Sequence, residues 1–141
     1  MRKIEQQMIS AVKDCKDWRN DNTIVMYSPS RKVSCVYLHK NLIATISKDE
    51  VEIYDGGWQS NTTKSRLNAI IKGLCDGYNQ GVYQRDFTWY IQDDEDGADF
   101  TIPFQHGYTF ARLLCFVLLY KFVAVFFLLA IKAEIRSEQT S

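Results

Sequence analysis

This 141-residue sequence is poor in the groups that enzymes use for catalysis. It has two histidines, and it lacks the motifs that present a nucleophilic serine, bind a nucleotide phosphate or hold a catalytic zinc ion. General acid–base chemistry therefore has few candidates, and carboxylate chemistry stays open. We expect a protein that is not an enzyme, with no cofactor, no metal and no small-molecule substrate.

The sequence also lacks an excess of basic residues. Its 17 lysines and arginines balance 17 aspartates and glutamates, and residues 1–111 hold 13 basic against 15 acidic side chains. Proteins that bind the phosphate backbone of nucleic acids normally carry a clear positive excess. The charge balance argues against a dedicated nucleic-acid-binding protein, although a local basic patch stays open.

Clustered cysteines are absent as well. Successive cysteines are 20 or 40 residues apart, which is a poor spacing for a zinc site. No apolar run follows the basic residues Arg2 and Lys3, so the sequence predicts no secretory signal peptide. We expect the domain in the reducing cytosol, with free thiols at Cys15, Cys35, Cys75 and Cys115.

Hydrophobic periodicity predicts an α+β fold, in which an antiparallel β-meander packs with two amphipathic helices. The meander occupies residues 23–55, and Pro103 restricts a late strand to a sheet edge. An acidic run at 93–99 is expected to be an exposed loop, and its glycine does not fall where a calcium loop needs one. The remaining expected elements are a helix at 4–18, a hairpin at 81–84 and 87–92 with its turn at 85–86, and a strand at 100–104.

The stretch from Asp55 to Leu74 contains the second helix. Its apolar residues recur at the helical spacing i, i+3, i+4 and i+7, which predicts one buried stripe formed by Leu67, Ile70, Ile71 and Leu74. Two glycines supply the turn before the helix. A hydroxyl group at Thr62 or Thr63 is expected to cap its first turn, and Gly77 to end it.

Polar and charged residues gather at the start of this helix. Its N–H groups and dipole could hold an anion, with Thr62, Thr63, Lys64 and Arg66 as candidate ligands. A plain helix cap with solvated charges explains the same residues. Trp58, just before the helix, is either an exposed platform for a partner or a core residue.

The composition changes at about Gly107, which predicts an α+β domain at 1–106 and a tail at 107–141. Residues 113–131 carry one charge in nineteen positions, Lys121. A helix of that length spans roughly 28 Å, close to the ~30 Å hydrocarbon core of a bilayer. We therefore predict a C-terminal transmembrane helix, with a buried core helix as the alternative. Lys121 would reach the interface or contact a polar group of another helix.

Two segments carry a family resemblance. Val-Tyr-Leu-His-Lys-Asn-Leu-Ile-Ala-Thr-Ile at 36–46 and Asp-Gly-Gly-Trp-Gln-Ser-Asn-Thr-Thr-Lys-Ser-Arg-Leu-Asn-Ala-Ile at 55–70 resemble a small, functionally uncharacterised domain family of tailed bacteriophages, including short-tailed phages of the T7-like kind. The resemblance covers about residues 33–92. It implies a phage origin and a compact domain, and it supplies no activity and no site residues.

Together these features predict a phage accessory protein that binds a host or phage protein. The domain would face the cytoplasm, tethered to the host inner membrane by a single-pass helix, which raises its concentration near a membrane-associated target. The alternative is a soluble nucleic-acid-binding module that uses Lys64, Arg66, Lys72 and exposed aromatic side chains. In that alternative the tail helix would be buried in an oligomer, and we do not favour it.

Overall fold

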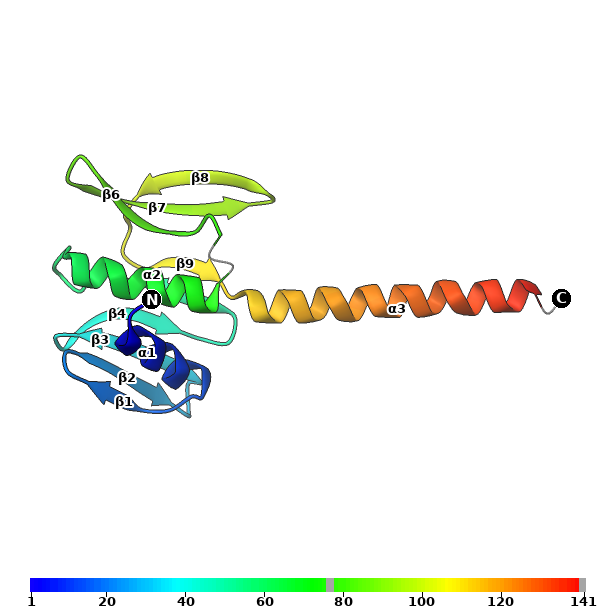
Figure 1. Cartoon of the computed structure of the whole chain (residues 1–141), viewed down its shortest axis with the longest axis horizontal. Coiled ribbons are helices and arrows are strands. Elements are labelled where there is room, and N and C mark those ends of the chain that lie inside the picture. Colours follow the sequence, from blue (N-terminus) through cyan, green and yellow to red (C-terminus); the bar gives the residue numbers. More distant parts are fainter. Residues whose placement is uncertain (76–77, 140–141) are drawn as a thin grey trace.

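The computed structural model describes residues 1–75 and 78–139, and the side chains of these residues except those of 113–122. The fold is α+β, with two antiparallel sheets, two packed helices and a long C-terminal helix (Figure 1). The elements, in chain order, are α1 (Lys3–Lys13), β1 (Trp18–Asn20), β2 (Thr23–Ser28), β3 (Val33–Leu38), β4 (Asn41–Ile46), β5 (Glu50–Ile53), α2 (Asn61–Leu74), β6 (Gly81–Arg85), β7 (Thr88–Glu95), β8 (Ala98–Pro103), β9 (Tyr108–Ala111) and α3 (Leu113–Gln139).

The larger sheet has six strands in the order β1-β2-β3-β4-β5-β9. Its consecutive strands confirm the meander expected at 23–55, because polar turn residues separate alternating segments there. β9 comes from far along the chain and pairs antiparallel with β5, which sets Phe110 opposite Val51. Phe110 is completely buried. The boundary expected after residue 106 stays a prediction, but β9 lies beyond it and completes the sheet.

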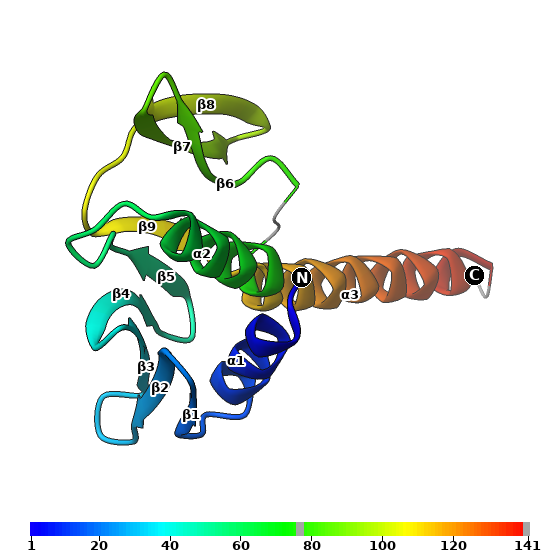
Figure 2. The ribbon, with the colours of Figure 1, turned by 60° about the vertical axis from the view of Figure 1, so that its left-hand side comes forward.

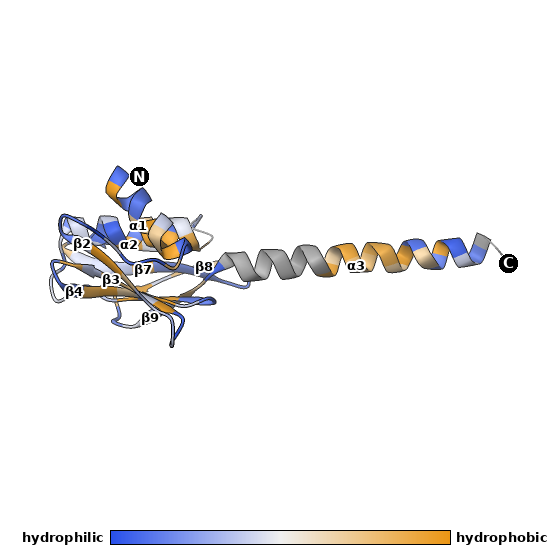
Figure 3. Ribbon diagram, turned by 90° about the horizontal axis from the view of Figure 1, so that it is seen from below, coloured by the Kyte–Doolittle hydropathy of each residue, from blue (hydrophilic) through white to orange (hydrophobic). Residues whose placement is uncertain are grey.

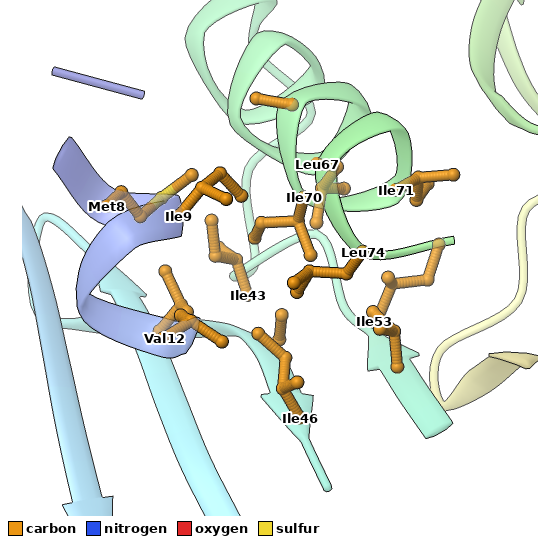
Figure 4. Close-up of a cluster of buried hydrophobic side chains, with 14 of the residues drawn as sticks. Met8, Ile9, Val12, Ile43, Ile46, Ile53, Leu67, Ile70, Ile71 and Leu74 are labelled. Atoms are coloured by element: carbon orange, nitrogen blue, oxygen red, sulfur yellow. The ribbon is translucent and has the colours of Figure 1, made fainter. Parts of the chain in front are cut away.

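Both α1 and α2 cover the same face of this sheet (Figure 2). The expected apolar stripe of α2 is confirmed, since its four members are buried, and Ile70 and Leu74 face the side chains of β4 (Figure 4). The two helices approach closely at Gly73, where a Cβ atom would lie 3.1 Å from Cγ2 of Ile9. A glycine in this helix therefore serves helix–helix packing, at the cost of lower helix propensity.

Two details of the helices differ from expectation. α1 ends at Lys13 instead of residue 18, because Cys15 adopts a left-handed φ of 53° and Trp18 pairs with Val25 as part of β1. The cap of α2 is Ser60, whose hydroxyl oxygen accepts a hydrogen bond from the backbone N–H of Thr63. The expected terminator Gly77 lies outside the described residues.

The smaller sheet has the order β6-β7-β8, which confirms an edge position for the strand that contains Pro103. The acidic run is not a loop throughout, which corrects our expectation. β7 continues through Glu95, so the turn consists of Asp96 and Gly97, and Asp93 is 8% exposed. Extending the hairpin pairs backbone groups that a loop would leave to water.

The tail forms the single helix α3, which points away from the rest of the molecule (Figure 1). The expected helix is confirmed and continues to Gln139. Within the part of the chain that the structure describes, no helix is both long and apolar enough to cross a membrane, so the transmembrane character expected for 113–131 is not supported. The first part of that run, with Lys121, lies outside the described side chains.

Candidate interaction surfaces

The loop between β5 and α2 is held by Asp55. The Asp55 carboxylate accepts a hydrogen bond of 2.7 Å from the backbone N–H of Gly57 and lies 3.3 Å from Nε2 of His106. Gly56 has a φ of 71°, and a Cβ atom there would lie 3.1 Å from a methyl group of Ile43. These contacts fix the loop against the sheet while Trp58 stays outside, 76% exposed.

Arg66, an expected anion ligand, lies in the core instead of at the surface. Its Nη1 atom is 3.0 Å from Oε1 of Glu5, and its Nε atom donates to the hydroxyl oxygen of Thr23. Ser65 donates a 2.6 Å hydrogen bond to the same Glu5 oxygen. Both charged side chains are 4% exposed. Arg66 therefore joins α2 to α1 and β2, and it cannot meet an anion or a nucleic acid at the surface.

The other candidate residues also do not form a shared site at the helix start. Thr63 is 3% exposed, and its hydroxyl group contacts the capping Ser60. Thr62 and Lys64 are half-buried, and Nζ of Lys64 lies 3.4 Å from Oε1 of Gln84 on β6. The structure thus does not gather the four expected anion ligands into one site. Trp58 remains the exposed one of the candidate residues.

Sequence reasoning missed a second exposed aromatic residue, Phe87. Its alternation with Trp89 and Ile91 indicates a strand face, but it lies in the turn between β6 and β7. Phe87 is 94% exposed and has a φ of 62°, and Asp86 before it has a φ of 48°. This turn and the loop before α2 both lie at the end of the molecule opposite α3 (Figures 1 and 2). A bulky residue in this backbone region is strained, and such strain often marks a functional position.

Two titratable groups, the half-buried Tyr108 and the buried Cys75, are held in unreactive forms. The phenol of Tyr108 donates a 2.6 Å hydrogen bond to Asp93, and burial, followed by this bond, raises the pKa of Tyr108 well above its usual value. Burial likewise raises the pKa of the Cys75 thiol to about 12. Both groups therefore stay protonated at neutral pH, so neither is a ready base or nucleophile.

α3 presents the largest exposed apolar segment of the described residues. Every residue from 123 to 138 is exposed, and the apolar part runs from Val123 to Ile131 before charged residues follow (Figure 3). Its large side chains are 44–69% exposed. A polar contact by Lys121, expected from the sequence, lies outside the described side chains.

A family model matches most of the chain. The model described as "Kyanoviridae Gp96 protein" covers residues 1–111, from α1 through β9. No curated protein and no solved structure matches the chain. The expected phage family is confirmed over a longer stretch than 33–92, whereas a T7-like, short-tailed origin is not confirmed, because Kyanoviridae are myoviruses. The chain therefore belongs to the Kyanoviridae Gp96 family of phage proteins.

Proposed function

We propose that this chain is a non-enzymatic phage accessory protein that holds an interaction domain, residues 1–111, at the host inner membrane. The observation that carries the proposal is the exposure of apolar side chains along α3 from Val123 to Ile131. Apolar surface of this extent is unfavourable in water, at about 25 cal/mol per Å². A lipid phase removes that cost, and the domain then faces the cytoplasm.

The distribution of these side chains around α3 favours lipid over a single partner helix. Successive residues of an α-helix are about 100° apart. One side of the helix therefore carries Val123, Phe127 and Ile131. The far side carries Val125 and Leu129, and Leu128 lies between the two sides. A partner helix covers one stripe of about 100°. Lipid surrounds the whole circumference, as this distribution requires.

The opposite end of the molecule supplies the contact with a partner. Trp58 and Phe87 are both exposed there, with Arg85 beside Phe87. Tryptophan and arginine are enriched among the residues that dominate binding energy at protein interfaces. A domain anchored at α3 would direct this end away from the membrane, toward a host or phage protein.

Membrane fractionation tests the tether. The full chain, produced in bacteria, should stay in the membrane pellet after a carbonate wash, and a variant that ends at residue 112 should not. Replacing Phe127 and Leu129 with lysine should shift the chain to the supernatant, because each charge costs about 2.5–3.5 kcal/mol at the centre of a bilayer. A matched Phe87→Lys variant should stay in the pellet. Complete release of the unmodified chain by carbonate contradicts the proposal.

Site-specific photo-crosslinking tests the interaction end. A photoreactive residue at position 87 should form adducts with one discrete protein in infected cells, and the same residue at the exposed position of Lys13 should not. Equal yields of crosslinked protein from both positions would show random collisions and would contradict a partner contact at Phe87.

A further inference from the structure

The face of the six-stranded sheet that α1 and α2 leave uncovered has an unusual composition. The strand register places six apolar or weakly polar side chains side by side on this outer face, at its centre: Ile24, Met26, Val33, Cys35, Tyr37 and Leu42. Met26 is 53% exposed and the others are half-buried. We call this set the outer strip.

A solvated sheet face normally carries polar side chains that alternate with the core residues. The central strands β2, β3 and β4 contain no charged residue on either face. The core side of these strands faces the two helices, which explains its apolar residues. The outer strip has no such explanation, so the composition indicates that this face is covered in the functional state of the protein.

Charged residues border the outer strip with opposite signs on its two sides. Arg19 lies on the outer face of β1, and Glu50 and Glu52 lie on the outer face of β5. The acidic side is also hollowed by a cavity of about 250 Å³, which Cys35, Glu50 and Glu52 line together with Arg31 from the turn between β2 and β3. The strip is thus basic at one side, apolar at the centre, and acidic and concave at the other.

We propose that a second copy of this chain covers the outer strip, through face-to-face packing of the two sheets about a twofold axis parallel to the strands. Such an axis sets β2 of each copy opposite β5 of the other, and β1 opposite β9. The exposed Met26 of one copy then faces the hollow beside Glu52 of its mate, and Arg19 on β1 of each copy faces β9, one strand away from Glu50 and Glu52 on β5 of the other. Face-to-face sheets pack about 10 Å apart in this way.

Self-complementarity favours a second copy over a different protein. In a twofold interface the same patch serves both partners, so a protrusion and its matching hollow must both occur on one surface. Met26 and the cavity meet this condition, because the register places Met26 on β2 level with Glu52 on β5. The dimer does not depend on the proposed membrane tether, since its surface lies within the strands β1 to β5 and β9 and does not include α3.

Crosslinking through Cys35 tests the dimer. Cys35 lies near the centre of the sheet, so the two copies of this residue should come within reach of a bis-maleimide of about 10 Å span. The full chain, purified in mild detergent with Cys15 and Cys115 changed to serine, should yield a covalent dimer. The matched chain that keeps exposed Cys15 and lacks Cys35 and Cys115 should stay monomeric. No dimer from Cys35, or equal yields from both thiols, overturns the proposal.

Two substitutions of Met26 test the orientation. Met26→Glu should lower the Cys35 crosslink yield at least tenfold, because the new carboxylate would face Glu52 of the other copy. Met26→Lys should retain most of the yield, because its ammonium group would meet that carboxylate. The control Phe87→Glu should leave the yield unchanged. Equal loss with lysine and glutamate, or crosslinking of Cys35 in cells to a different protein instead of a second copy, contradicts the proposed twofold packing.

Discussion

The buried ion pair between Glu5 and Arg66 makes the strongest prediction about stability. We consider the substitution Arg66→Ala, which removes the guanidinium group and leaves the Glu5 carboxylate, 4% exposed, without its charged partner. The carboxylate keeps one hydrogen bond from Ser65, and Thr23 loses the N–H donor that reaches its hydroxyl oxygen. A buried charge is left largely uncompensated.

The magnitude follows from that desolvated charge. Removing one partner of a buried ion pair typically costs 3–5 kcal/mol, whereas replacing both partners with apolar residues is often neutral. We expect Arg66→Ala to lower the free energy of unfolding by about 3–5 kcal/mol, which shifts the melting temperature of a domain of this size by on the order of 10–20 °C. The double variant Glu5→Leu, Arg66→Met should recover most of this loss.

Unfolding of the full chain, followed by tryptophan fluorescence during heating and in urea, measures these differences. Lys64→Ala is the control, because Lys64 lies on the same helix but makes one long, exposed contact, and it should change stability by less than about 0.5 kcal/mol. If Arg66→Ala and Lys64→Ala have equal effects, the pair is solvated and the reasoning is wrong. If the double variant is as unstable as Arg66→Ala, the attraction and hydrogen bonds of the pair itself, and not the orphaned charge, decide the cost.

Three further outcomes are expected. A chain that ends after residue 112 should show a cooperative unfolding transition in circular dichroism. A chain that ends after residue 106 should not, because it loses β9 and the buried phenylalanine of that strand. Two equally folded products would refute this role of β9. Phe87→Gly should raise the free energy of unfolding by about 1 kcal/mol, since glycine adopts a φ of 62° without strain, and a loss of stability would contradict the turn geometry. Cys75 should resist a thiol reagent at pH 8 while Cys15 reacts. Burial raises the Cys75 pKa from 9.0 to about 12, so the neutral thiol stabilises the folded chain below pH 9. This contribution should be lost as the pH rises toward 12, and the variant Cys75→Ala should lose less stability over the same pH range.

Local patterns in the sequence were sufficient for most helices and strands. The apolar stripe of α2 and the alternation in β2 to β5 reflect short-range geometry, because side chains repeat every 3.6 residues in a helix and every two in a strand. They failed where a distant segment decides the outcome. Trp18 continues a helical pattern, but it joins β1 because β2 offers it a pairing strand.

The expected anion site at the start of α2 shows the same limit of local sequence patterns. A row of threonines and cations at a helix start indicates an anion site, and the positions of Thr62 and Lys64 on the first turn agree with that pattern. Whether a cation faces water depends on the angle at which the helix packs. In this fold the Arg66 side of α2 faces α1, and a glutamate 61 positions earlier in the chain neutralises it.

By itself, the sequence determined the α+β class, the meander, the buried face of α2, the helical tail and a phage origin. The structural features depend on composition and on repeats of one helical turn or two strand residues, and the phage origin depends on the resemblance of two segments to a phage family. Only the tertiary structure decided that Arg66 is buried, that β9 closes the sheet, that Phe87 is exposed and that the outer strip stays uncovered in the single chain. The burial of Arg66 and the pairing of β9 depend on contacts between residues tens of positions apart. The exposure of Phe87 depends on its left-handed turn, and that of the outer strip on which face of the sheet the helices cover.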